Sequence, residues 1–171
     1  MGSRKAQTLN DIFEVLEIDP DGKKFDKGKQ VDADAIFKVL PPLPAVSRIR
    51  AHSDLFQMDM LLDVNVDIYP IKLGEKLALC LASTLNLDGT PSGGSYDSVR
   101  GGGGRRNLAD EFEYVMHGKI FKFKDSSSGG QVKAEVYISF GGLLMELRGD
   151  PRRLSDLDVD EDVFLLLKKV T

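Results

Sequence analysis

The most suggestive chemical pattern in the sequence is a run of carboxylates near its end, Asp158-Val159-Asp160-Glu161-Asp162. Alternating carboxylates can bind calcium or magnesium. A calcium loop of the EF-hand type starting at Asp158 would need glycine at its sixth position and glutamate at its twelfth. The chain has Val163 and Lys169 there. We therefore predict no metal site and interpret the run as a solvated lead-in to a final strand.

Candidate nucleophiles and zinc ligands are few. The chain has one cysteine, Cys80, and two histidines, His52 and His117. A single thiol cannot form an internal disulfide, and these three residues provide too few ligands for a zinc site. Cys80 lies in the apolar run 77–81, which predicts a small buried side chain rather than a nucleophile. Neither histidine has a triad partner nearby in the sequence, so we predict no catalytic residue and no cofactor.

A run of glycines at positions 101–104 resembles a phosphate-binding loop at first sight. No Gly-Lys-Ser/Thr sequence follows the run, and no helix begins directly after it. The surrounding residues 88–106 are rich in glycine, serine and arginine, a composition that buries little surface and keeps high backbone entropy. We predict a flexible loop there. Arg100, Arg105 and Arg106 could contact a phosphate backbone, and a solubilising charge cluster is an equal alternative.

The elements that must position any site are β-strands. The clearest signal runs from Met58 to Ile68, where apolar residues alternate with mostly polar ones until Pro70 ends the pattern. Seven further segments read as strands: 11–19, 46–52, 75–85, 112–124, 132–138, 143–148 and 163–168. Residues 107–111 are the best candidate for a short helix, and 125–131 for a flexible hairpin connection. About eight short strands at this spacing predict an all-β sandwich or barrel, in one domain covering residues 1–171.

Two glycines, Gly141 and Gly142, interrupt this strand pattern between Phe140 and Leu143. Glycines in such a position mark a bulge, a sharp bend or the close approach of another backbone. An intramolecular bend in a barrel explains them, and so does a docking surface for a partner chain. The two explanations are compatible.

Composition excludes several classes of protein. The chain is 42% hydrophobic and 29% charged, which is typical of a soluble globular protein. No apolar stretch is long enough to span a bilayer, and the first residues lack the apolar region of a secretion signal. The net charge is −4 and the pI is about 5.2. Nucleic-acid-binding modules usually carry a basic surface, so this balance argues against a free-standing one.

Several segments together resemble the eighth subunit common to nuclear RNA polymerases I, II and III. They follow the family's order and approximate spacing, and they cover nearly the whole chain apart from the first residues, the glycine-rich loop and one insertion. The segments are Asp11-Ile12-Phe13, Asp19-Pro20, Val46-Ser47-Arg48-Ile49, Leu62-Asp63-Val64-Asn65-Val66, 81–87 (LASTLNL), 108–118 (LADEFEYVMHG), 137–145 (YISFGGLLM) and the leucine-rich C-terminus.

The resemblance implies a single antiparallel barrel of about eight strands, related to the oligonucleotide-binding fold. It implies a non-catalytic subunit of the nucleus and nucleolus that sits outside the enzyme against the largest subunit, whose carboxylates hold the magnesium. Other shared subunits are implied as partners, and contact with nucleic acid as indirect or weak. We expect docking through strand edges and an apolar patch. The predicted partner-binding residues are Tyr137, Ser139, Phe140, Gly141, Gly142, Leu143, Leu144 and Met145.

One segment departs from the family pattern. Residues 28–45, which are 18 residues long, separate Lys27 from Val46, and connections of this length are uncommon inside compact domains. One hypothesis is a retained in-frame intron of 54 bases, three for each of the 18 residues. Gly28-Lys29 can encode a GTAAG donor, Ala33-Asp34 a branch-point-like CTGAC, and Ala45-Val46 a terminal AG. The rival is a genuine lineage-specific loop. We favour the intron because both ends fit at once.

An alternative function follows from the kinship with oligonucleotide-binding barrels. A single-stranded nucleic-acid binder needs exposed aromatic side chains with basic neighbours on one face. The best candidates are Lys119, Phe121, Lys122, Phe123 and Lys124. The acidic pI weighs against this alternative. An independent enzyme has little support, because the sequence contains no convergent set of polar residues.

Overall fold

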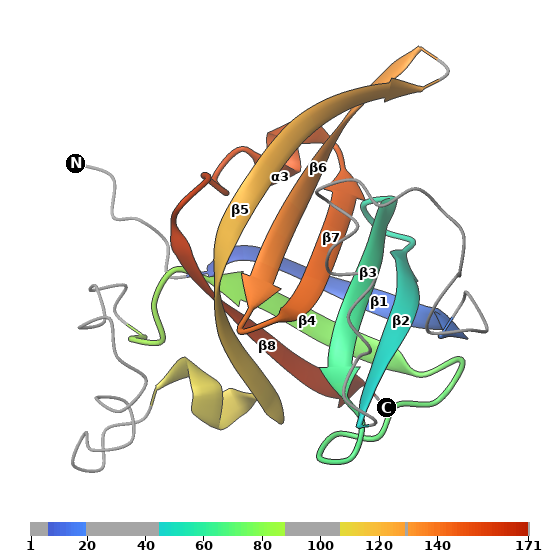
Figure 1. Cartoon of the computed structure of the whole chain (residues 1–171), viewed down its shortest axis with the longest axis vertical. Coiled ribbons are helices and arrows are strands. Elements are labelled where there is room, and N and C mark those ends of the chain that lie inside the picture. The colour runs from blue at the N-terminus through green and yellow to red at the C-terminus, as the bar shows by residue number, and fades with distance from the viewer. Residues whose placement is uncertain (1–6, 20–44, 88–106, 129, 171) are drawn as a thin grey trace.

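Eight β-strands form the framework of the chain in the computed structural model, which describes residues 7–19, 45–87, 107–128 and 130–170 (Figure 1). The strands are β1 (Gln7–Ile18), β2 (Val46–Ser53), β3 (Met58–Asn65), β4 (Lys76–Ala82), β5 (Tyr114–Ser128), β6 (Gln131–Phe140), β7 (Leu143–Gly149) and β8 (Asp162–Val170). The two short helices are η2 (Leu108–Glu111) and α3 (Pro151–Leu154). The predicted loop 88–106 and all but the last residue of the predicted insertion 28–45 lie outside the described residues.

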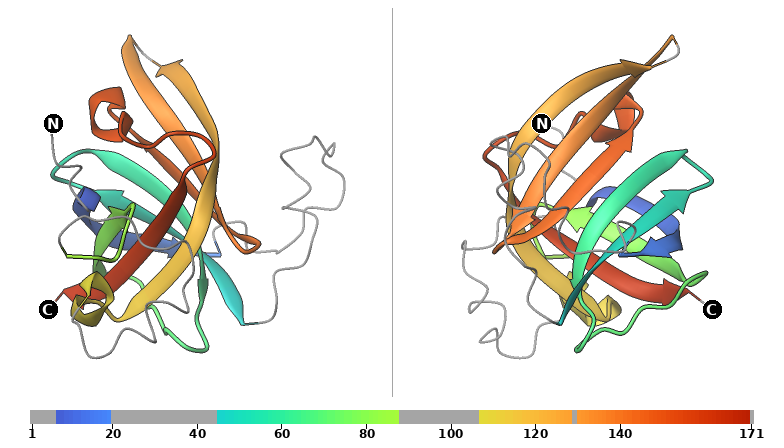
Figure 2. Two further views of the ribbon diagram at one scale, coloured as in Figure 1. Left: turned by 90° about the vertical axis from the view of Figure 1, so that its left-hand side faces the viewer. Right: turned by 45° about the vertical axis from the view of Figure 1, so that its right-hand side comes forward.

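The strands close into one barrel in the order β1-β2-β3-β7-β6-β5-β8-β4, and all neighbouring pairs are antiparallel. This confirms the predicted all-β barrel of about eight strands. The far ends of β5 and β6 project beyond the rest of the barrel as a two-stranded ribbon (Figures 1 and 2). Gly130, with a φ of 81°, lies in the turn of this ribbon.

Alternation along β3 places its apolar residues inside the barrel. Met58, Met60, Leu62 and Val64 are buried, as period-two patterning predicts. The strand ends at Asn65 rather than at Ile68, so the predicted boundary is too late. The Asn65 side chain accepts a hydrogen bond from the Asp67 amide at 3.2 Å. This local turn competes successfully with the strand ladder.

Side chains fill the barrel, so its interior is the main hydrophobic core. At one end, the connection between β3 and β4 brings Tyr69 against Tyr114, with ring centroids 5.2 Å apart. The hydroxyl of Tyr69 donates to Glu113 at 2.8 Å, and burial raises the pKa of Tyr69. Leu154 of α3 and Leu157 join the same core.

A second, smaller core lies on the outside of the barrel. Its buried members are Cys80, Ala82, Leu85, Leu108, Phe164 and Leu166, from β4, β8 and η2. Leu108 donates its amide hydrogen to the Leu85 carbonyl at 2.8 Å, and Asn107 caps η2. Cys80 is buried, as predicted, and burial raises the pKa of its thiol to about 12. This thiol is therefore a poor nucleophile at neutral pH.

Candidate partner-binding surfaces

The hairpin between β6 and β7 explains the two central glycines of the predicted partner-binding segment. Phe140 pairs with Leu143, so Gly141 and Gly142 form a two-residue turn with φ values of 61° and 100°. Two-residue hairpin turns with positive φ at both positions strongly favour glycine. Both glycines are exposed, and an added Cβ would meet open space. The turn therefore accounts for them and leaves its tip accessible to a partner.

The remaining residues of this segment divide between the two faces of the sheet. Phe140 and Met145 are buried in the barrel core, and Leu143 is half-buried against that core. Tyr137, Ser139 and Leu144 are half-buried with their neighbours on the core side fully covered. The surface available to a partner is therefore the outward residues and the glycine turn.

Strand edges are not available in this segment. The strand β6 pairs with β5 on one side and with β7 on the other, and β7 continues the sheet to β3. Where the β3–β7 ladder stops, the Leu144 amide donates to the Asp63 carboxylate at 3.0 Å. The expected docking through a strand edge therefore does not apply here, and side chains must make the contact.

Five outward residues of β5, β6 and β7 form an interconnected cluster, which we call the polar ladder: Lys124, Glu135, Tyr137, Glu146 and Arg148. Glu135 accepts from the Nε and Nη2 atoms of Arg148 at 3.0 and 2.6 Å. The Nζ of Lys124 lies 3.4 Å from Glu135. The Tyr137 hydroxyl lies 3.0 Å from Glu135 and 3.4 Å from Glu146. The register sets these residues side by side although up to 24 positions separate them in the sequence.

The electrostatics of the polar ladder are those of a matched network. Glu135 is only 3% exposed. Burial by itself would raise the pKa of Glu135, but hydrogen bonds from Arg148 and Tyr137 and the charges of Arg148 and Lys124 outweigh it, so its pKa is lowered. Burial, together with Glu146 and Glu135, raises the pKa of Tyr137. The network is therefore ionised and satisfied at neutral pH.

The predicted nucleic-acid candidates lie beside this network. Lys119, Phe121 and Lys124 are exposed, whereas Phe123 is half-buried against the barrel core. A bulge at Phe121 places its ring 6.2 Å from the Tyr137 ring, and the Nζ of Lys122 lies 5.6 Å from the same ring. The aromatic and basic residues thus gather around Tyr137, while Phe123 serves the core.

The histidines and the acidic run have ordinary surroundings. The Nδ1 atom of His52 lies 2.8 Å from Asp59, and the ring of His117 packs 4.7 Å from that of Phe164. Asp160, with a φ of 72°, lies in the turn before β8. Among the described residues, no group of three or more His, Cys, Asp or Glu side chains is arranged to hold a metal ion. The same part of the chain contains no helix long and apolar enough to cross a membrane.

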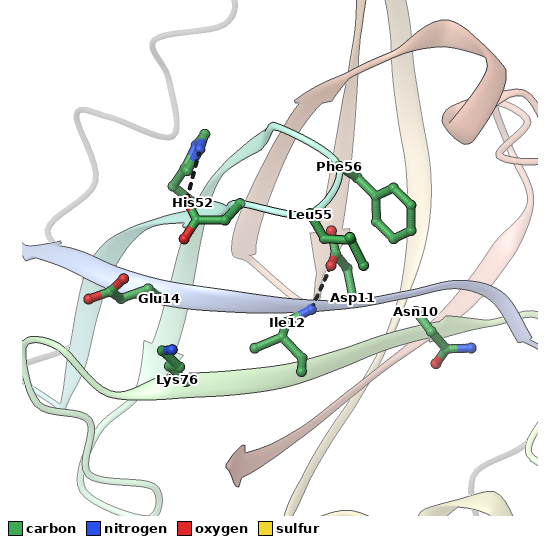
Figure 3. A pocket seen from close by; sticks show the side chains of 9 residues that line it. Asn10, Asp11, Ile12, Glu14, His52, Leu55, Phe56 and Lys76 are labelled. Carbon is green, nitrogen blue, oxygen red and sulfur yellow. Dashed lines mark hydrogen bonds and ion pairs between the residues drawn. The ribbon is translucent and has the colours of Figure 1, made fainter. Parts of the chain in front are cut away.

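A surface that the sequence analysis missed lies beside β1 (Figure 3). We call it the β1 groove, a depression of about 420 Å³ that is lined mainly by apolar surface. Its lining residues are Asn10, Asp11, Ile12, Glu14, His52, Asp54, Leu55, Phe56 and Lys76. The one available signal was the apolar pair Leu55-Phe56 in a segment that connects two strands. The pairing of β1 with β2 and β4, which builds the groove, could not be read from the sequence.

Comparison with known proteins places this barrel in a family. Residues 43–169 match the family model described as RNA polymerase Rpb8. The chain is 44% identical to DNA-directed RNA polymerases II, IV and V subunit 8B of Arabidopsis thaliana, over 95% of both chains. It is 42% identical to the DNA-directed RNA polymerases I, II, and III subunit of Dictyostelium discoideum, over 94% of this chain and 96% of that one.

The budding-yeast relative, from Saccharomyces cerevisiae, is also a DNA-directed RNA polymerases I, II, and III subunit. It is 34% identical over 94% of this chain and 97% of its own. A solved molybdate-binding protein aligns with a TM-score of 0.27 and 11% identity, which is too low to carry an argument. The family model and the near full-length relatives agree with the resemblance noted in the sequence, and the chain belongs to the RNA polymerase Rpb8 family.

Proposed function

We propose that this chain is a shared, non-catalytic subunit of nuclear RNA polymerases I, II and III, and that it supports assembly by docking on the largest subunit of each. The observation that carries the proposal is the near full-length match to subunits of that name in distant organisms. A barrel filled by its own core suits a scaffold, because its outer side chains are held in fixed positions. The other shared subunits are proposed as further partners.

The proposed docking surface is the outward side of the segment 137–145 with its exposed turn at Gly141 and Gly142. Tyr137 is an amphipathic aromatic residue fixed by the polar ladder, which is the kind of anchor that interfaces favour. Ser139 and Leu144 flank it on the register of β6 and β7. Phe140 and Met145 are proposed to act from the core by holding this surface in shape.

Affinity purification of the tagged chain at its native level, followed by mass spectrometry, tests the function. We expect the largest subunits of all three polymerases to be recovered. Ser139→Arg, which places a long cation on the proposed surface, should lower that recovery at least tenfold. Ser83→Arg, an exposed serine after β4, is the matched control. A folded, soluble chain that recovers no polymerase subunit would contradict the proposal.

A single-stranded nucleic-acid-binding barrel is the second candidate function. The gathering of Phe121, Lys122 and Tyr137 on one face favours it. The net charge of −4 opposes it. Titration of the isolated chain with a short oligonucleotide at two salt concentrations separates the candidates, because this function requires affinity that falls steeply with salt.

Two further proposals concern place and transcript. We propose a nuclear location that includes the nucleolus, and fluorescence microscopy of the tagged chain checks it. We also propose that residues 28–45 derive from a retained intron. The family-model match starts at residue 43, near the end of this segment, which supports an atypical origin. The presence of the 54 bases in every mature transcript would exclude the intron, since each of the 18 residues needs three bases.

A further inference from the structure

The β1 groove forms because β1 runs past the end of β2. β1 pairs with β4 from Gln7 to Glu14, but with β2 only from Glu14 to Ile18. The turn between β2 and β3, residues 54–57, lies over the part of β1 that β2 leaves uncovered (Figure 3). The edge of the opening is closed from within, because the Asp11 carboxylate accepts the Ile12 amide hydrogen at 2.8 Å and the Ser53 hydroxyl hydrogen.

Apolar side chains around the groove are exposed to an unusual degree. Leu55 is 77% exposed, and Ile12 is 48% exposed on the outer face of β1. Leu16 is 51% exposed and lies on the same strand. A single exposed leucine needs no explanation, but several around one depression mark a binding surface.

The turn that carries Leu55 is preformed. Phe56 packs against the barrel core, and the guanidinium of Arg153 lies 3.2 Å from its ring centroid. The Gln57 side chain donates to the Asp54 carbonyl at 2.7 Å, and Gln57 adopts a φ of 52°. A ligand would therefore meet a fixed Leu55 and would lose little affinity to ordering of the turn.

The charges around the groove select among ligands. Three carboxylates, those of Asp11, Glu14 and Asp54, line it, against one lysine, Lys76. The side chain of Asp54 is 90% exposed and lies 3.8 Å from His52, whose other ring nitrogen is taken by Asp59. This excess of negative charge opposes phosphate groups and favours a cation on the ligand.

We infer that the β1 groove binds an extended segment of a polymerase subunit in which an apolar side chain lies next to a lysine or arginine. The apolar side chain packs against Ile12 and Leu55, and the cation approaches Glu14 and Asp54. The identity of the partner as a polymerase subunit rests on the proposed function. The groove and the segment 137–145 are then two separate contacts of one subunit with the enzyme.

Photo-crosslinking in the assembled enzyme tests this inference. Benzoylphenylalanine replaces Leu55 in the tagged full chain, and in a matched chain it replaces Leu73, which is 64% exposed in another turn. From position 55 we expect a crosslink to a polymerase-subunit peptide that contains an apolar residue beside lysine or arginine. From position 73 we expect no crosslink to that peptide.

Charge reversal provides the second readout. Glu14→Lys with Asp54→Lys should lower polymerase recovery at least fivefold, whereas Asp156→Lys with Asp158→Lys, two exposed carboxylates before β8, should leave it unchanged. Recovery of polymerase without the expected crosslink would overturn this inference alone. A crosslink from position 55 only to nucleic acid, to a second copy or within the chain would also overturn it. Failure of the unmodified chain to recover polymerase would overturn the proposed function as well.

Discussion

The polar ladder and the β1 groove are two outward surfaces of one barrel with opposite degrees of internal satisfaction. In the ladder, Glu135 is surrounded by Arg148, Tyr137 and Lys124, and its charge is compensated within the chain. In the groove, Leu55 and Ile12 remain exposed and the carboxylates outnumber the cations. The ladder therefore contributes to stability by itself, while the groove has more to gain from a partner.

The largest expected effect comes from distorting the sheet behind the ladder. A Cβ added at Gly118 would meet the Ser139 carbonyl oxygen at 2.3 Å and the Phe140 ring at 2.6 Å. Since backbone atoms cannot move aside, Gly118→Ala should lower the free energy of unfolding by about 3 kcal/mol, measured by urea denaturation. Gly142→Ala, at an open turn position, is the control and should cost about 1 kcal/mol. Equal effects at both positions would contradict the close packing of β5 on β6.

The next effect breaks the ladder itself. Glu135→Ala removes the shared acceptor of Arg148 and Tyr137 and should cost about 2 kcal/mol of unfolding free energy. Arg148 and Lys124 can turn to solvent, which keeps the cost below that of a fully buried pair. Glu146→Ala, which removes only the longer contact to Tyr137, should cost less than half as much. A double-mutant cycle with Arg148→Ala gives the coupling energy, and a value near zero would refute the ladder's contribution.

A pH series sharpens the same comparison. The pKa of Glu135 is lower in the folded chain than its value of about 4.3 in an unfolded chain. Its stabilisation is therefore fully present above that unfolded pKa and is lost as the pH falls through the folded pKa. The difference in unfolding free energy between the unmodified chain and Glu135→Gln should be constant from neutral pH to about 5 and shrink below about 4. A difference that grew on acidification would have the wrong sign.

The smallest effect is expected in the groove. Ile12→Thr and Leu55→Asn alter exposed side chains and should each change the unfolding free energy by less than about 0.5 kcal/mol. Leu62→Ala, at a fully buried position of β3, is the contrasting control and should cost about 3 kcal/mol. Thermal denaturation of the three variants measures this. A loss above 1 kcal/mol at position 55, against the roughly 0.5 kcal/mol usual for surface changes, would make Leu55 a structural residue.

Much of the fold could be predicted because it depends on local patterns. The alternation from Met58 onward indicated which face of β3 is buried, and the pair Gly141-Gly142 indicated a sharp bend. The strand boundary after Asn65 was missed because a single side-chain hydrogen bond to Asp67 decides it. Of the predicted partner-binding residues, Phe140 and Met145 proved to face the core. Which outward residues a partner touches stays a prediction.

The sequence by itself determined the family, the strand-rich class and the inward or outward direction of most side chains, because these follow from motif order and from a repeat of two residues. The tertiary structure alone decided which outward residues become neighbours. Glu135 meets Arg148 through the register of β6 on β7, and the β1 groove exists because β1 extends past β2. Register and strand overlap are set by packing between segments far apart in the chain, and no local pattern encodes them.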